Sequence, residues 1–379
     1  MIIATFLACL CAFIIMMNLI SVAIMARKCR ARPRNLAVPN DAPPVTIVRP
    51  LRGLEAFSEE ILRASFELDY PQYELIFCVQ SEDDPIIPLV NRMIAGHQDR
   101  EARLLIGDDR ISVNPKLNNC VKGWDAARYD YVILADSNAL PPIDYIQTML
   151  AAFQEDTALT VSMPIGSRPA SFWALVECAI LNTFQARWQY GAEAIGIGFA
   201  QGKNMMWRRE VLDRAGGLAA LGAEVAEDAA ATKIVRARNM RVRLVDMPFE
   251  QPLGARTAQE VYTRHARWSR LRRATFPAYY APEIMNGSFV AVLSGAIAAQ
   301  GFGFDPLVAA AIIISLLHGS ELVLAKICGF VLEWRTPFAL AIRDLLLPVI
   351  FIDGLIFDNF SWHGEAMTVR EPRDALKTS

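Results

Sequence analysis

The 379-residue sequence lacks a surplus of positive charge, since 38 Lys and Arg stand against 40 Asp and Glu for a net charge of −2. It therefore lacks the broad basic field that nucleic-acid binding uses, and no nucleic-acid partner is expected. The four histidines lack metal-ligand spacing, and the seven cysteines form no CxxC pair, which argues against a zinc site. Charge is also scarce, at 21% of residues against 53% hydrophobic, which excludes a disordered chain.

The hydrophobic surplus is concentrated at the two ends of the chain. Residues 1–26 contain no Asp, Glu, Lys or Arg, and five basic residues follow within 27–34. A run of this length spans a bilayer core of about 30 Å, and a signal peptide would carry its positive charge before the apolar core. We therefore predict a transmembrane anchor at 1–26 and a basic juxtamembrane linker at 27–42. By the positive-inside rule the linker is cytoplasmic.

The second hydrophobic region covers 283–360. Charge-free residues 284–304 and the nearly as apolar residues 307–330 flank Asp305-Pro306, which predicts a transmembrane helical hairpin.

Residues 338–360 are interrupted by four charged side chains, so this segment either spans the membrane or lies at its interface. The side of the membrane that holds the polar tail, 361–379, depends on that choice and stays open.

Residues 43–282 have the composition of a soluble α/β domain. Strand patterns occur at 45–48, 73–80, 103–106 and 129–135. Helical patterns lie between them, at about 58–67, 87–95 and 118–127. This alternation predicts a mostly parallel sheet with helices on both faces.

Carboxylates follow two of these predicted strands. Asp83 and Asp84 come after the second, and Asp136 comes after the fourth. Ligands of such sheets bind beyond the carboxyl ends of the strands, and Mg²⁺ prefers one or two carboxylates together with substrate phosphates. Singly, each residue could equally be a turn former or a helix cap. Jointly, they favour a binding site.

Two further patterns each allow two interpretations, and a third matches no nucleotide-binding motif. Glu227-Asp228 lies in a helical pattern that is either a solvated face or part of a site. The segment R-H-A-R-W at 264–268 suits lipid headgroups or a phosphate. The segment G-I-G-F-A-Q-G-K-N at 196–204 fails both the P-loop and the dinucleotide-binding patterns.

Taken in order, several motifs resemble one known family. They are E-D-D-P at 82–85, N-P-K-L-N-N at 114–119, L-A-D-S-N at 134–138, A-E-D at 226–228 and R-H-A-R-W. As a set they resemble the ceramide glucosyltransferase family, a membrane-anchored branch of inverting GT-A glycosyltransferases, in a bacterial member. The resemblance implies a GT-A nucleotide-sugar-binding domain between N- and C-terminal transmembrane helices.

The resemblance also implies roles for individual residues. Asp84 is expected in the nucleotide pocket, and Asp136 is expected to hold Mg²⁺ or Mn²⁺ with the donor diphosphate. Asn138 replaces the second carboxylate of a full D-x-D motif. Asp228 is the expected catalytic base, and Lys116 is a candidate contact to phosphate or to the uracil pocket.

A last motif, (Q/R)-x-x-R-W, is matched by Arg264, Arg267 and Trp268, which are expected near the diphosphate and the acceptor.

The implied reaction moves a hexose, glucose from UDP-glucose, onto the primary hydroxyl of ceramide with inversion. The implied location is the bacterial inner membrane, with several passes and a cytoplasmic catalytic domain. The sequence leaves open a hopanoid or other lipid alcohol as acceptor and other UDP-sugars as donor. It also leaves open a non-catalytic membrane scaffold with this fold, and it leaves the oligomeric state unknown.

Overall fold

The computed structural model describes residues 1–31, 36–362 and 365–369, which form two compact units. Unit 1 comprises Met1–Arg30, Ile165–Gly191 and Leu253–Glu371, and unit 2 comprises Ala31–Pro164 and Ala192–Pro252. The range 43–282, expected as one catalytic domain, thus contributes to both units, and its boundaries stay a prediction.

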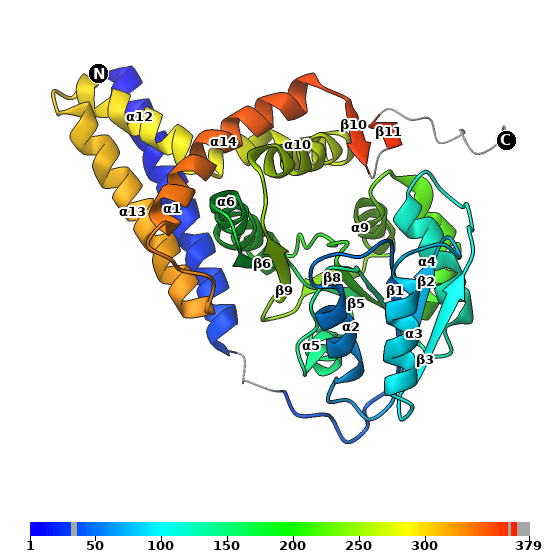
Figure 1. The fold of residues 1–379 in the computed structure, drawn as a ribbon. Coiled ribbons are helices and arrows are strands. Elements are labelled where there is room, and N and C mark those ends of the chain that lie inside the picture. Colours follow the sequence, from blue (N-terminus) through cyan, green and yellow to red (C-terminus); the bar gives the residue numbers. More distant parts are fainter. Residues whose placement is uncertain (32–35, 363–364, 370–379) are drawn as a thin grey trace. The chain divides into compact units, whose positions relative to one another are not determined.

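Unit 2 is built on a seven-stranded sheet (Figure 1). In spatial order its strands are β3 (Glu101–Ile106), β2 (Tyr73–Val79), β1 (Val45–Pro50), β4 (Tyr131–Ala135), β7 (Asn204–Arg208), β5 (Thr157–Val161) and β8 (Arg241–Leu244). Neighbouring strands are parallel except at β7, which runs antiparallel to both β4 and β5. The expected mostly parallel sheet is confirmed, and its first four strands lie where the sequence pattern placed them.

Helices cover both faces of this sheet. They are α2 (Ser58–Phe66), α3 (Ile87–Gly96), α4 (Pro115–Ala126), α5 (Tyr145–Ala151), α8 (Arg209–Asp213), the 3-10 helix η2 (Gly217–Ala223) and α9 (Glu227–Ala237). Buried side chains of α2, α3 and α5 pack with Ile47 and Phe77 in one core. The opposite face meets α4 at Gly123, where a Cβ atom would lie 2.4 Å from Val48 Cγ1. Only glycine permits this approach.

Unit 1 is mainly helical. Its helices are α1 (Ile2–Ala31), α6 (Phe172–Cys178), the π-helix η1 (Ala179–Ala186), α10 (Ala258–Thr275), α11 (Pro277–Tyr280), η3 (Ala281–Met285), α12 (Ser288–Gly301), α13 (Pro306–Cys328) and α14 (Thr336–Ile356). A small hairpin of β10 (Asn359–Trp362) and β11 (Glu365–Thr368) follows α14. The chain changes unit within β6 (Pro164–Pro169), α7 (Arg187–Ala194) and β9 (Phe249–Gly254).

Two of the described helices are long and apolar enough to cross a membrane, α1 and α13. The expected hairpin partner is shorter: α12 has 14 residues and is bent by 51° from the preceding segment, Pro277–Met285. Asp305 caps α13 by accepting from the Leu307 and Val308 amides at 2.8 and 3.2 Å.

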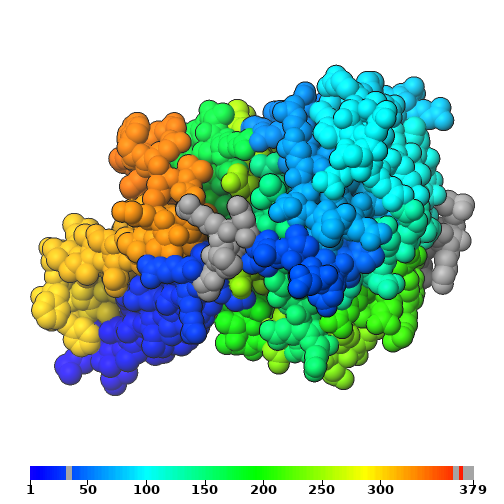
Figure 2. Space-filling model, turned by 90° about the horizontal axis from the view of Figure 1, so that it is seen from below, coloured from blue at the N-terminus to red at the C-terminus, as the bar shows by residue number. Residues whose placement is uncertain are grey.

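Helices α1, α12 and α13 share one apolar cluster. It contains Cys11 and Ile14 from α1, Ala291 from α12, and Ile313 and Leu317 from α13. Figure 2 shows the dark blue N-terminal helix beside the yellow and orange helices of this group.

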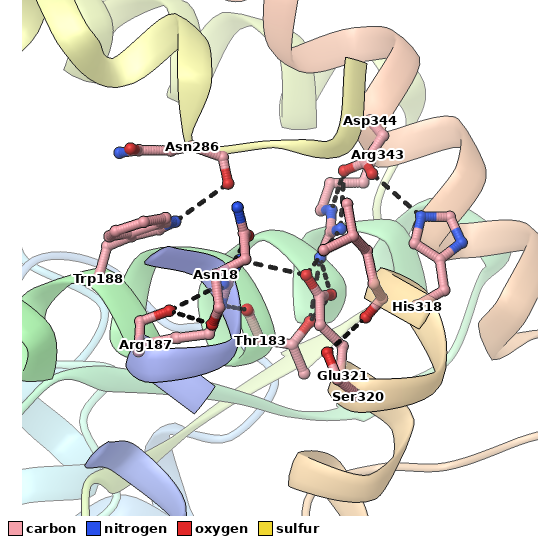
Figure 3. A network of polar contacts seen from close by, with 12 residues as sticks. Asn18, Thr183, Arg187, Trp188, Asn286, His318, Ser320, Glu321, Arg343 and Asp344 are labelled. Atoms are coloured by element: carbon pink, nitrogen blue, oxygen red, sulfur yellow. Dashed lines mark hydrogen bonds and ion pairs between the residues drawn. The ribbon is translucent and has the colours of Figure 1, made fainter. Parts of the chain in front are cut away.

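Helix α14 covers most of the segment whose membrane contact the sequence left open. Its charged residues Arg343 and Asp344 are 1% and 5% exposed, so they point into unit 1 rather than outward. Figure 3 shows the polar network that receives them. Arg343 Nη1 donates to Glu321 Oε2 of α13 at 2.5 Å, and His318 Nε2 lies 3.0 Å from Asp344. Because each buried charge has a partner, the helix can remain in an apolar environment.

The same network joins α1 to the first residue of α7, Arg187. Arg187 is 1% exposed and donates to Asn18 Oδ1 at 2.7 Å and to Glu321 Oε1 at 3.2 Å. Its Nε also donates to the carbonyl of Thr183 in the π-helix at 2.8 Å. The helices of unit 1 are therefore tied by buried ion pairs as well as by apolar packing.

Candidate active site

The candidate site lies in unit 2 at the carboxyl ends of β1, β2 and β4. Strand β1 pairs with β2 on one side and with β4 on the other. Strands β2 and β3 thus extend the sheet in one direction from β1 and β4 extends it in the other, which makes a topological switch point beside β1. Such a switch point leaves a crevice beyond the strand ends, where ligands of open α/β sheets bind. Asp136 directly follows β4 and so stands at this edge.

Asp136 is held by the first residues of the antiparallel strand β7. Ala135 opposes Asn204, and the Asp136 amide donates to the Lys203 carbonyl at 2.9 Å, which sets Lys203 directly across from Asp136. Residues so opposed place their side chains on the same face. Lys203 Nζ accordingly lies 2.6 Å from Asp136 Oδ2 and 2.8 Å from Asn138 Oδ1.

A second lysine reaches Asp136 from the start of α4. Asn114 caps this helix by accepting from the Lys116 and Leu117 amides at 3.0 and 3.2 Å, and Pro115 opens the first turn. Lys116 Nζ then lies 2.8 Å from Asp136 Oδ1 and 2.7 Å from Glu227 Oε1, and it also donates to the Gly202 carbonyl. Lys116 therefore bridges two carboxylates that are distant in the sequence.

Helix α9 brings the remaining two carboxylates. Glu227 and Asp228 form its first turn, where the helix dipole favours negative charge. Glu227 is buried and its Oε2 accepts from Asn114 Nδ2 at 2.7 Å. Both carboxylates lie against Gly202, where a Cβ atom would stand 2.8 Å from Glu227 Oε1 and 3.6 Å from Asp228 Oδ2. A side chain at position 202 would therefore displace the Glu227 carboxylate from its place beside Lys116.

The charged groups of this cluster shift one another's pKa values. Burial alone would raise the pKa of Asp136, but Lys116 and Lys203 outweigh it and hold that pKa well below its usual range. Burial and the neighbouring Glu227 raise the pKa of Asp228 to about 7, although Lys116 opposes them. Asp136 is thus a fixed anion, whereas Asp228 exchanges its proton near neutral pH.

Asp84 belongs to a second set of contacts at the same sheet edge. Its carboxylate accepts from the Gly53 amide at 3.0 and 3.1 Å and from the Ile86 amide at 3.0 Å. Gly53 has a φ of +68°, which favours glycine. Asn119, one turn after Lys116 on α4, donates to the carbonyls of Leu51 and Cys78 at 3.1 and 2.8 Å. One face of α4 therefore contacts both the Asp136 cluster and the carboxyl ends of β1 and β2.

Arg264, Arg267 and Trp268 lie on α10 in unit 1. Arg264 Nη1 donates to the fully buried Glu177 of α6 at 2.7 Å, and the ring of Trp268 packs edge-on against His265 at 5.0 Å. Burial, together with Arg264, lowers the pKa of Arg267 to about 10. The role of these three residues at a diphosphate stays a prediction.

Residues 6–375 match the family model described as Glycosyl transferase family 21. The chain belongs to glycosyl transferase family 21. Two relatives from Caenorhabditis elegans support this assignment. Ceramide glucosyltransferase 1 is 28% identical over 69% of this chain and 56% of its own length. Ceramide glucosyltransferase 3 is 25% identical over 84% of this chain and 71% of its own length.

A solved structure shares the fold of this family 21 chain. The mannosyltransferase PcManGT from Pyrobaculum calidifontis, in complex with GDP-Man and Mn²⁺, superimposes with a TM-score of 0.50 at 17% identity. The match covers 93% of this chain and 99% of that one. The expected GT-A fold with a mostly parallel sheet is thereby confirmed.

The donor atoms of the family 21 site suit a hard divalent cation only in part. Among the described residues, no group of three or more His, Cys, Asp or Glu side chains is placed to hold a metal ion. Asp136 and Asn138 do present carboxylate and amide oxygens, which Mg²⁺ and Mn²⁺ accept. Such a sparse set fits a cation that takes its other ligands from substrate phosphates.

Sequence reasoning missed two members of the cluster. Lys203 and Gly202 lie in the 196–204 segment, which is not a P-loop but nevertheless supplies the cation opposite Asp136. Glu227 was visible only as a neighbour of Asp228, and its partnership with Lys116 depends on the tertiary fold. By contrast, Lys116 and Asp136, singled out separately, lie in direct contact.

Proposed function

We propose that this protein transfers glucose from UDP-glucose to the primary hydroxyl of ceramide, with inversion at the anomeric carbon. The observation that carries this proposal is the family 21 match, which runs through the segments of both units, from residue 6 to 375. The names of the two relatives from Caenorhabditis elegans, both ceramide glucosyltransferases, support glucose as the transferred sugar and ceramide as the acceptor in this proposal.

In this proposal Asp228 is the catalytic base. The ceramide oxygen attacks the anomeric carbon, the bond from that carbon to the diphosphate oxygen breaks, and Asp228 takes the hydroxyl proton. A base works best when its pKa lies near the working pH, and the pKa of Asp228 is raised to about 7. A single base suffices for a single displacement, and the product is a β-glycoside.

The lysine-bound Asp136 marks the proposed place of the donor diphosphate. Lys116 and Lys203 converge there, and ammonium groups stabilise the negative charge of a departing diphosphate. We propose that Asp136 also holds Mg²⁺ or Mn²⁺, which when bound supplies further positive charge to the diphosphate. Mn²⁺ accompanies GDP-Man in the archaeal neighbour of the same fold.

The remaining assignments extend this proposal along the chain. Asp84 would shape the nucleotide pocket through the Gly53 loop, and Arg264, Arg267 and Trp268 would act on the diphosphate and the acceptor. We further propose a multi-pass protein of the bacterial inner membrane whose catalytic site faces the cytoplasm. The candidate spans α1 and α13 support membrane attachment, and the five basic residues within 27–34 support the orientation.

The test is transfer of radiolabelled sugar from UDP-glucose to a short-chain ceramide, with purified protein in detergent and Mg²⁺ or Mn²⁺. UDP-galactose and a hopanoid acceptor are run in parallel, because the sequence leaves them open. The D228N variant should bind UDP without turnover, and the K233M variant, at an exposed ion pair with Glu224, should match the wild type. Nucleotide binding without transfer to any lipid would instead support a scaffold.

A further inference from the structure

Lys203 contacts the side-chain oxygens that the proposed metal at Asp136 would need. Its ammonium contacts both ends of the D-S-N segment, Asp136 at 2.6 Å and Asn138 at 2.8 Å. The antiparallel pairing of β4 with β7 enforces this position, because it sets Lys203 directly opposite Asp136. The contact therefore results from strand register rather than from the chance orientation of a surface lysine.

The two lysines on Asp136 differ in how firmly they are held. Lys116 contacts Asp136 Oδ1, Glu227 Oε1 and the Gly202 carbonyl, which together match the three donors of an ammonium group. Lys203 contacts Asp136 Oδ2 and Asn138 Oδ1, both in the D-S-N segment itself. Lys203 can therefore turn to a new acceptor by giving up only its contacts with the D-S-N segment. Lys116 would also have to give up its contact with Glu227.

We propose that Lys203 is an internal cation that couples metal binding to donor binding, an inference that rests on the proposed function. A divalent ion at Asp136 must share its oxygen ligands with the Lys203 ammonium, and the two positive charges repel each other. A donor diphosphate offers Lys203 new oxygen acceptors and so releases Asp136 and Asn138 to the metal. The protein then binds metal weakly alone and tightly together with the nucleotide.

A purely structural role for Lys203 makes a different prediction. Oppositely charged residues across an antiparallel pair stabilise the sheet, so removal of Lys203 would lower stability in either case. Only the coupling role predicts that metal affinity without nucleotide rises when the lysine is removed. Metal binding in the absence of substrate therefore separates the two roles, and it requires no catalytic turnover.

The experiment titrates the full-length protein in detergent with Mn²⁺ and follows free Mn²⁺ by electron paramagnetic resonance, with and without UDP. For K203M we expect Mn²⁺ binding without UDP to tighten at least about tenfold. This change corresponds to only a modest part of the repulsion energy between the Lys203 ammonium and an adjacent Mn²⁺ ion. By linkage, the factor by which UDP strengthens Mn²⁺ binding should fall by a similar amount. K203R keeps the cation and should bind Mn²⁺ as the wild type does, and K233M is the matched lysine control.

An unchanged Mn²⁺ affinity in a folded K203M protein would overturn the coupling, and so would tight Mn²⁺ binding by K203R. Circular dichroism checks the fold, and K203Q, which retains a donor for Asn138, replaces K203M if that variant does not fold. Failure of the proposed function has another signature. In that case the wild type transfers no glucose to ceramide, whereas the Mn²⁺ affinities without nucleotide still decide the role of Lys203.

Discussion

Replacing Asp228 with Asn should abolish transfer and at the same time stabilise the protein at alkaline pH. Burial and Glu227 make the charged form of Asp228 unfavourable in the folded state, which raises the pKa of Asp228 from 3.8 to about 7. Asn has nearly the same shape as the neutral acid but cannot take a proton from the acceptor. One substitution therefore removes the base and the buried charge together.

The sign of the stability effect follows from the raised pKa. Below about pH 4 Asp228 is protonated in both folded and unfolded chains, so Asn gains nothing. As the pH rises above 4, the unfolded chain ionises first, and the folded wild type loses relative stability until the pH passes about 7. Because the pKa is raised by about three units, the stability that D228N gains over the wild type at pH 8 is at most roughly 4 kcal/mol. Because Asp228 is partly exposed and its charge is coupled to that of Glu227, we expect about half of this, a Tm rise of about 4 °C.

Thermal unfolding of the wild type and of D228N is measured in detergent from pH 4 to pH 8, with transfer assayed at pH 7.5. The two Tm values should coincide near pH 4 and separate with increasing pH, and transfer should fall by at least about 10³-fold. The reasoning is refuted if D228N is less stable than the wild type at pH 8, or if the Tm difference does not change with pH. Residual turnover near the wild-type rate would refute the base assignment alone.

Three further substitutions test the packing around the site and the helices. D136N should weaken UDP binding in the presence of Mn²⁺ by about 100-fold and lower Tm, because two half-buried ammonium groups lose a shared carboxylate; calorimetric titration measures the affinity. G202A should lower transfer at least about tenfold and also lower Tm, since its Cβ would lie 2.8 Å from Glu227 Oε1. R343M should destabilise the protein by about 3 kcal/mol, because Glu321 and Asp344 both lose a buried cationic partner, and R343K, which keeps the charge, should lower Tm less.

The sequence predicted the four strands that contain apolar runs bounded by turn signals, β1 to β4. Of these, β1, β2 and β4 are mostly buried, and their patterns are readable without the fold. Strands β5 and β8 are short and mixed, T-A-L-T-V and R-V-R-L, so their pairing depends on neighbours far along the chain. Strand β7 enters antiparallel between β4 and β5, a position that no local pattern encodes.

The residues of the candidate site also divide into those that the sequence predicted and those whose place depends on the tertiary fold. Asp136 was visible because it directly follows the buried strand β4, and Asp84 was visible because it lies in the acidic loop after β2. Lys203 was not visible, because its place depends on the register of β7 with β4. In the C-terminal hydrophobic region, the sequence left the environment of the α14 charges undecided, since only the tertiary structure supplies Glu321 as the partner of Arg343.

The charge balance of the cluster explains why such a site needs additional cations. Asp136, Glu227 and ionised Asp228 carry three negative charges against two on the lysines, so the site is negative when its base is ready to act. A diphosphate that enters adds further negative charge and favours the protonated, inactive form of Asp228. Positive charge delivered with the donor reverses that effect and keeps the pKa of the base near neutral. Lys203 would meet this requirement if it released Asp136 to a metal ion when the diphosphate binds. Its ammonium would then remain beside the diphosphate, and the metal ion would add to the total positive charge of the site.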